Sequence, residues 1–197
     1  MRNNSVNKKI IGVVILLVVT VALIALFKPE SRSLAPRQLG GDFTFNTADG
    51  EIKLADFKGK LVLLYFGYTS CPDICPTSLT SMKFAFKALS DEELGKIQAI
   101  FVSVDPERDL LAHLKTYSTF FSPKIIGATG SREQIDDAIE KYGAYYRFVK
   151  QEESAMAYTV DHSSRIYLIN QQGKMVESVP HNNDPALLAE KIKSYLK

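Results

Sequence analysis

The stretch from residue 61 to residue 76, LVLLYFGYTSCPDICP, decides the expected fold. Its first part, Leu61–Phe66, is a continuous apolar run, which is typical of a strand buried on both faces of a sheet. Its second part places Cys71 and Cys75 four residues apart, just before Thr77–Leu89, whose apolar residues recur at helical spacing. A strand that leads through two cysteines into a helix puts them at the sheet edge where α/β folds bind ligands.

Strand and helix patterns alternate after this stretch. Further strands are expected at 97–104, 125–128, 145–149, 165–169 and 174–179. A short hairpin is expected before residue 61, at 43–46 and 51–54. Further helices are expected at 110–117, after the capping pair Ser131 and Gln134, and after Asp184 with Pro185 at the first helical position. This order predicts an α/β fold with a central mixed sheet and helices on both faces. We expect the thioredoxin-like form of it.

The composition fits one folded domain with an appendage. The chain has 197 residues, 46% of them hydrophobic and 23% charged, with a formal net charge of +2. These values exclude a long disordered chain, and the near-neutral charge argues against a nucleic-acid binder. Residues 1–28 carry four basic side chains and no acidic one, so the remainder is mildly acidic.

The N-terminal region predicts a membrane anchor. Ile10–Phe27 is an 18-residue run without a charge, and a helix of that length rises ~27 Å, close to the thickness of a bilayer core. It is long for a signal peptide, and no clear cleavage motif follows it directly, so an uncleaved anchor is favoured. We expect residues 1–9 in the cytoplasm, a transmembrane helix at 10–27, a linker at 28–40 and the domain at 41–197.

The expected location follows from this anchor. A short basic N-terminus before an apolar span normally remains inside while the body is exported. The N-terminal segment has a single arginine, Arg2, whereas mitochondrial transit peptides are Arg-rich and amphipathic. The sequence thus favours a bacterial inner membrane, a single pass and a domain that faces the periplasm.

The two cysteines leave three chemistries open: a structural disulfide, a redox-active dithiol and a soft metal site. A structural disulfide would close a very small loop and add little stability. Redox pairs in thioredoxin folds are more often CxxC, and the wider spacing here suits a metal ion as well as a disulfide. If Cys71–Cys75 forms the first helical turn, the two sulfurs can converge on one face.

A third ligand separates these alternatives. Of the three histidines, His113 lies on a predicted helix surface and His181 in a polar loop. His162 precedes the strand at 165–169, in a loop expected to face the cysteines, and we expect it to be a metal ligand. Two thiolates and one imidazole suit copper, whereas structural zinc usually takes four protein ligands. Asp161 is either an orienting partner of the imidazole or a solvated carboxylate, and Met156 is better explained as core filler.

Three segments together resemble the Sco/SenC family. They are Gly67–Pro76 (GYTSCPDICP), Ser103–Asp109 (SVDPERD) and Val160–Ser163 (VDHS), in matching order behind one apolar span. The resemblance implies a thioredoxin-like domain that binds Cu(I) or Cu(II) through Cys71, Cys75 and His162. It also implies an accessory role near the site for Asp105, Pro106 and Asp109, although a turn with helix caps explains these three equally well.

The family resemblance also implies a function. Sco/SenC proteins assist assembly of the dinuclear copper A centre in cytochrome c oxidase subunit II, as copper donors, as reductants of the target cysteines, or both. Another copper donor or thiol reductant would be a further partner. The expected protein is mainly a metallochaperone, with Tyr68, Pro72 and Ile74 as a candidate docking surface.

Two other functions remain open from the sequence. A thiol–disulfide oxidoreductase of the periplasm would need the redox-active pair Cys71 and Cys75 but not His162. The absence of a proline in the loop at 161–164, where thioredoxins hold a cis-proline, favours copper over general disulfide exchange. A peroxidase of the peroxiredoxin type would need T-x-x-C, and Thr69 misses that spacing by one position.

Overall fold

The computed structural model describes residues 4–26, 38–151, 157–181 and 184–197, in two compact units, Met1–Arg37 and Gln38–Lys197. The first unit contains one helix, α1 (Asn4–Leu26), which covers most of the predicted apolar span. Within the described part of the chain, no helix is found that is both long and apolar enough to cross a membrane. The helix is therefore confirmed, and the transmembrane anchor stays a prediction.

The second unit is built on a five-stranded mixed sheet. Its strands are β3 (Leu61–Gly67), β4 (Ile97–Ser103), β5 (Ile125–Ala128), β8 (Arg165–Ile169) and β9 (Met175–Pro180), in the order β5-β4-β3-β8-β9. β3 pairs with β4 in parallel and with β8 in antiparallel register, which makes β3 the central strand. All seven of its residues are buried, as the apolar run predicted.

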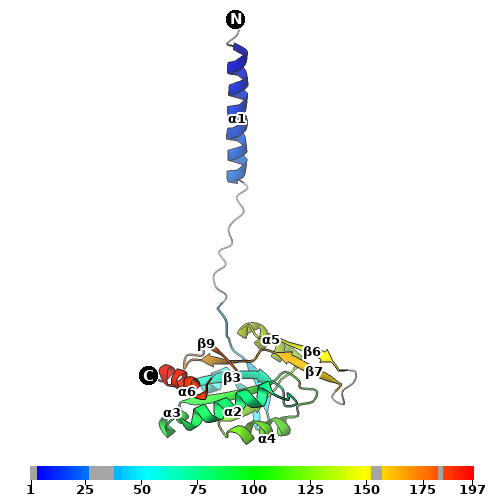
Figure 1. The fold of residues 1–197 in the computed structure, drawn as a ribbon, viewed down its shortest axis with the longest axis vertical. Helices are drawn as coiled ribbons and strands as arrows, with labels where there is room; N and C mark the ends of the chain where they lie inside the picture. Colours follow the sequence, from blue (N-terminus) through cyan, green and yellow to red (C-terminus); the bar gives the residue numbers. More distant parts are fainter. Residues whose placement is uncertain (1–3, 27–37, 152–156, 182–183) are drawn as a thin grey trace. The chain divides into compact units, whose positions relative to one another are not determined.

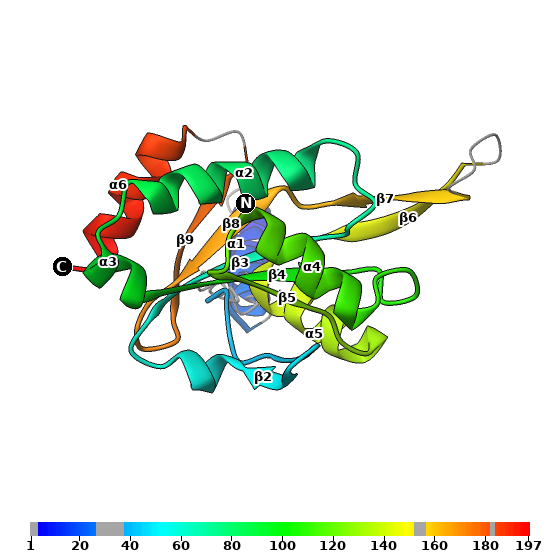
Figure 2. The same cartoon turned by 90° about the horizontal axis from the view of Figure 1, so that it is seen from below.

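Helices cover both faces of this sheet. They are α2 (Ile74–Lys87), α3 (Asp91–Gly95), α4 (Leu111–Phe121), α5 (Arg132–Tyr142) and α6 (Pro185–Tyr195), and Figures 1 and 2 show α2, α4 and α6 together on the face opposite α5. Successive side chains of β3 point to opposite faces of the sheet and pack against different helices. Tyr65 packs on Phe101 towards α2 and α4, whereas Phe66 packs on Tyr142 of α5.

Two hairpins complete the unit. β1 (Thr44–Thr47) pairs with β2 (Gly50–Lys53), followed by the short 3-10 helix η1 (Leu54–Phe57). β6 (Tyr146–Lys150) pairs with β7 (Tyr158–His162) as a separate two-stranded ribbon. The sequence did not predict β7 or α3. It did predict both caps: Ser131 accepts from the Gln134 amide and Asp184 from the Ala186 amide.

Candidate metal centre

Three segments that are far apart in the sequence each supply one side chain to the site. Cys71 lies in the turn that follows β3, Cys75 is the second residue of α2, and His162 is the last residue of β7. Residues 71–75 do not form a helical turn, because α2 begins at Ile74, three residues before the predicted start at Thr77. The sulfurs converge nonetheless, since the turn folds back and Cys71 Sγ accepts the Cys75 backbone N–H at 3.4 Å.

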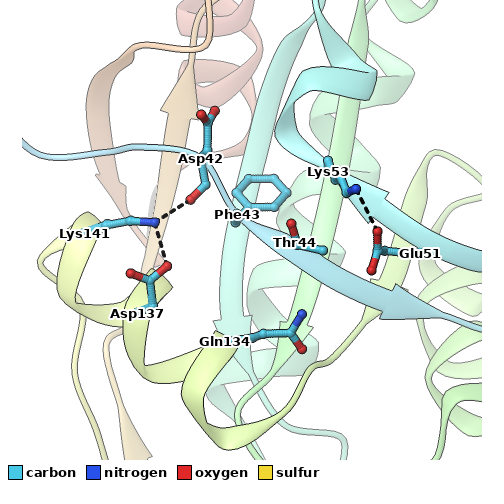
Figure 3. A pocket seen from close by; sticks show the side chains of 8 residues that line it. All are labelled: Asp42, Phe43, Thr44, Glu51, Lys53, Gln134, Asp137 and Lys141. Carbon is cyan, nitrogen blue, oxygen red and sulfur yellow. Dashed lines mark hydrogen bonds and ion pairs between the residues drawn. The ribbon is translucent and has the colours of Figure 1, made fainter.

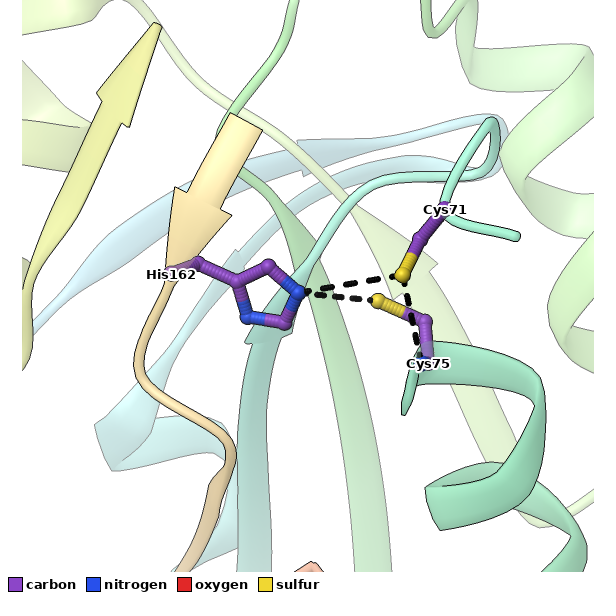
Figure 4. A group of neighbouring side chains, drawn as sticks. All are labelled: Cys71, Cys75 and His162. Atoms are coloured by element: carbon purple, nitrogen blue, oxygen red, sulfur yellow. Dashed lines mark hydrogen bonds between the residues drawn. The ribbon is translucent and has the colours of Figure 1, made fainter. Parts of the chain in front are cut away.

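The three donor atoms form one compact group. His162 Nε2 lies 3.3 Å from Cys75 Sγ and 4.0 Å from Cys71 Sγ (Figure 4). All three ligand atoms lie within 4.8 Å of one another, and within the described residues no fourth His, Cys, Asp or Glu joins them. Both cysteines are free thiols. The set predicted from the sequence, Cys71, Cys75 and His162, is thus brought together by the fold.

The imidazole of His162 is oriented from two sides. Its Nδ1 lies 3.2 Å from the carbonyl oxygen of Ser163, which leaves Nε2 towards the sulfurs. The rings of Tyr65 and Tyr68 meet it edge-on, with centroids 6.1 and 5.8 Å away. A carbonyl on one ring nitrogen is the usual way in which a protein fixes a ligating histidine.

The two thiols differ in burial and in acidity. Cys75 is fully buried, and burial raises its pKa well above the ordinary value. Cys71 is half-buried, and its hydrogen bond with Cys75 lowers its pKa to about 3, with His162 acting in the same direction. The pair therefore consists of an accessible thiolate and an inaccessible thiol.

Gly67 makes room for the buried sulfur. A Cβ at this position would lie 2.6 Å from Cys75 Sγ and 2.9 Å from the ring of Phe101. Real Cβ atoms essentially never come that close to a neighbour. The last residue of β3 is therefore constrained by the metal centre itself.

The turn that carries Cys71 is held by a buried carboxylate. Asp109 is 2% exposed and accepts three hydrogen bonds. Its Oδ2 accepts from the Thr69 amide at 2.8 Å and from Ser103 Oγ at 2.5 Å, and its Oδ1 accepts from Thr69 Oγ1 at 2.5 Å. Asp109 thus ties the cysteine turn to the end of β4.

A second carboxylate holds the strand that carries His162. Asp105 is fully buried and accepts from Arg108 Nε at 2.5 Å and from the hydroxyl of Tyr158 at 2.9 Å. Arg108 also donates to the Tyr158 carbonyl and lies over the Tyr158 ring, 3.7 Å from its centroid. Tyr158 opens β7, four residues before His162. The accessory role expected of Asp105 and Asp109 is therefore positioning, and Pro106 lies in the turn between them.

The remaining candidates lie outside the donor group. Asp161 forms an ion pair with Arg147 at 2.7 Å, and both side chains are largely exposed, so it is a solvated carboxylate and does not orient the imidazole. His113 is exposed on α4, and His181 is not part of the group. Met156 lies outside the described residues.

A hollow of about 290 Å³ opens beside the thiolate. It is lined by Tyr68, Cys71, Pro72, Asp73, Ile74, Val160, Asp161 and His162. The three residues expected to form a docking surface are among them. A group that enters this hollow reaches Cys71 and His162, whereas Cys75 lies behind them.

Another hollow, of about 440 Å³, lies between the β1–β2 hairpin and α5 (Figure 3). Both lysines of its lining pair with acidic side chains: Lys53 with Glu51 at 3.0 Å, and Lys141 with Asp137 at 2.6 Å. It contains neither thiol nor imidazole, and we assign no chemistry to it.

The donor set fits copper. Thiolates are soft ligands that select Cu(I), and imidazole suits copper as well. The group offers three ligands rather than the four that structural zinc sites use. A mixed sheet with a dithiol after its central strand, faced by a histidine, defines a thioredoxin-like protein with a Cys₂His metal site.

Comparison with known proteins places the chain in a family. The SCO1/SenC family model matches residues 31–197. The chain is 40% identical over 154 residues to an SCO2-like protein of Rickettsia conorii, which covers 78% of this chain and 75% of the relative. The chain belongs to the SCO1/SenC family.

Solved structures agree in fold. ScoI of Bradyrhizobium japonicum, with copper bound, aligns with a TM-score of 0.72 at 36% identity, covering 80% of this chain and 99% of that one. BsSco, a member of the Sco family of cytochrome c oxidase assembly proteins described with a disulfide switch, aligns with a TM-score of 0.61 at 26% identity, covering 82% and 95%. The thioredoxin-like fold is thereby confirmed.

Proposed function

We propose that this chain is a membrane-anchored copper chaperone that assists assembly of the dinuclear copper A centre in cytochrome c oxidase subunit II. The observation that carries the proposal is the convergence of Cys71, Cys75 and His162 within 4.8 Å. A copper-bound Sco protein and a Sco member described in cytochrome c oxidase assembly are among the structures similar to it. Copper is the cargo that this donor set would carry.

The asymmetry of the site supports transfer. A target thiolate can approach through the hollow that exposes Cys71 and His162, and it can replace these ligands while Cys75 still holds the ion from behind. Three-coordinate sites leave room for an incoming ligand, as four-coordinate structural sites do not. The exposed side is thus the side from which copper would leave.

Copper binding by the reduced full-length chain tests the proposal directly. We expect one tightly held copper per chain, lost or strongly weakened in Cys71→Ser, Cys75→Ser and His162→Ala. His113→Ala is the matched control, because His113 is exposed on α4 and outside the donor group. Copper binding by His162→Ala equal to that of the unchanged protein would overturn the ligand set. Transfer to the copper domain of subunit II, followed by its copper A absorption, tests the target.

A thiol–disulfide oxidoreductase is the second candidate, favoured by the lowered pKa of Cys71 beside a buried Cys75. The Cys71 thiolate would attack a target disulfide, and Cys75 would lose its proton and displace the target sulfur. The target then holds two thiols and this chain a Cys71–Cys75 disulfide, which another thiol reductant must reopen. Disulfide reduction that survives in His162→Ala, without copper binding in the unchanged protein, would favour this function.

We propose the bacterial inner membrane as the location, with the domain in the periplasm. The apolar run 10–27 and the basic residues before it support this orientation. Protease added outside spheroplasts should digest the domain, and it should spare the domain if the orientation is reversed. A cytosolic reporter enzyme provides the control for intact cells.

A further inference from the structure

We infer that the surface formed by the C-terminal halves of α2 and α4 docks on an anionic lipid bilayer. This surface, the basic aromatic face, comprises Lys83, Phe84, Lys87, Phe120 and Lys124. The inference rests on the proposed membrane attachment but not on copper. It concerns the end of the domain away from the metal centre.

Two large aromatic side chains are exposed on this face. Phe84 is 50% exposed and Phe120 is 76% exposed. They belong to one surface, because Lys83 lies over the Phe120 ring at 5.8 Å and Lys87 lies over the Phe84 ring at 5.3 Å, and the two lysines are one helical turn apart. Figure 2 shows α2 and α4 on the same face of the sheet. Exposed aromatic side chains that gather on one surface and are bordered by polar groups mark an interaction site.

The charge on this face has one sign. α2 and α4 contain three lysines and no acidic residue, and Lys124 follows α4. A hollow of about 370 Å³ opens between the helices, with Phe86, Leu94, Phe121 and Pro123 in its lining beside Lys83, Lys87 and Lys124. The acidic residues that follow α2 in the chain are Asp91, Glu92 and Glu93 of α3, of which Glu92 pairs with Lys96 and Glu93 accepts the Ser90 amide. Basic side chains around apolar ones complement anionic headgroups over acyl chains.

Two threonine hydroxyls on α4, in the turn before Phe120, can leave water at low cost. The hydroxyls of Thr116 and Thr119 donate to carbonyl oxygens of their own helix at 3.1 and 2.7 Å. A hydroxyl that is already hydrogen-bonded does not oppose burial against lipid as a free one does. The helices thus present methyl groups and rings, with ammonium groups that can reach the headgroups.

The chain length favours a bilayer as the occupant. Residues 27–37 connect α1 to the domain, and eleven extended residues span at most about 40 Å. A domain tethered that closely meets the anchoring membrane at a high effective concentration, so a weak contact suffices. The face lies at the far end of α2 from Cys75, about 18 Å along the helix axis. Docking would therefore present the metal centre away from the bilayer.

The absence of tryptophan from the chain permits a direct test. In the full chain reconstituted into vesicles, Phe120→Trp places a single reporter on the face, and Phe148→Trp places one on the exposed side of β6. Brominated phospholipids quench tryptophan only on contact. We expect quenching at position 120 in vesicles with 30% phosphatidylglycerol, little in pure phosphatidylcholine, and none at position 148 in either.

Charge variants complete the test. Lys83→Gln with Lys87→Gln should lower the docked-to-free ratio roughly fivefold for each lysine removed. Lys83→Arg with Lys87→Arg keeps the charge and should keep the ratio of the unchanged protein. Arg147→Gln with Lys150→Gln on β6 removes the same charge elsewhere and should change nothing. No quenching at position 120 in anionic vesicles overturns the inference. So does equal quenching in neutral vesicles, or a signal that grows with protein concentration and indicates a second copy. Flotation of the chain with neutral vesicles tests the membrane anchor by itself, and copper binding tests the proposed function. Failure of either is thereby distinguished from failure of the docking.

Discussion

Replacing Gly67 by alanine should damage the metal centre without touching a ligand. The new methyl group would meet Cys75 Sγ at 2.6 Å, Phe101 at 2.9 Å and Tyr65 at 3.2 Å. All three neighbours are fully buried, so none can turn into solvent. The sulfur must therefore move, and it moves within a core that is already filled.

The magnitude follows from two opposing effects. An extra methyl group in a packed core costs about 1–3 kcal/mol. Alanine restricts the unfolded chain more than glycine does, which returns about 0.4–1 kcal/mol where the backbone angles suit both residues. Gly67 is outside the set of described glycines with positive φ, so that gain applies. The net destabilisation is about 1–2 kcal/mol, which lowers the melting temperature by roughly 2–8 °C for a chain of this size.

The assay combines thermal unfolding with competition against a Cu(I) chelator. We expect Gly67→Ala to melt earlier and to lose copper at a lower chelator concentration. Gly95→Ala is the matched control, because a Cβ there meets nothing within 4 Å. If Gly67→Ala melted and bound copper like the control, the close approach of β3 to Cys75 would not constrain the site, and the reasoning would be refuted.

Three further predictions address the supports of the site. Asp109→Ala leaves three donors without their buried acceptor and should lower the free energy of unfolding in urea by about 3 kcal/mol or more, with weaker copper binding. Unchanged stability would contradict the role of Asp109 in holding the turn of Cys71. Tyr158→Phe removes the hydroxyl bond to buried Asp105 but keeps the ring, so a loss of about 1–2 kcal/mol and faster copper release are expected, and unaltered release would argue against positioning through β7. Because the pKa of Cys71 is lowered from 9.0 to about 3, its ionisation stabilises the fold fully above the ordinary value, and this contribution is lost as the pH falls towards 3. Iodoacetamide should therefore alkylate metal-free Cys71 at a nearly constant rate from about pH 8 to about pH 5, whereas a rate that falls tenfold per pH unit, as expected of the unfolded chain, would contradict the shift.

Local chemistry explains which elements were predictable. The sequence predicted β5 and β8 at their observed bounds, and it predicted the caps of α5 and α6, because runs of apolar residues and capping pairs act over a few positions. α3 was missed although Ser90 and Glu93 form the same kind of capping box, since five residues show no helical period. β7 was missed because its ribbon carries few buried residues and its register depends on β6.

The site divides in the same way. The pair Cys71 and Cys75 stands out from spacing alone, whereas the assignment of His162 as a ligand needed the expected thioredoxin-like fold, which places it opposite the cysteines. The positioning role of Asp109 and Asp105 was not readable from the sequence. Their partners lie 40 and 53 residues away, at Thr69 and Tyr158. No local pattern distinguishes a buried clamp of this kind from an ordinary turn with caps.

The segment Ser103–Asp109 therefore has a physical reason to accompany the ligand segments. Through Asp109 it holds the turn of Cys71, and through Asp105 it holds the strand of His162, while Cys75 is held by the core itself. The two ligands that face the open hollow are thus supported by one loop, and the buried ligand is supported by β3. A site arranged in this way can exchange its exposed ligands without disturbing the sheet, since the hydrogen bonds of Asp109 and Asp105 with Thr69 and Tyr158 use none of the ligand atoms. That separation is what a protein needs if it is to hold a metal ion firmly and still hand it to another thiolate.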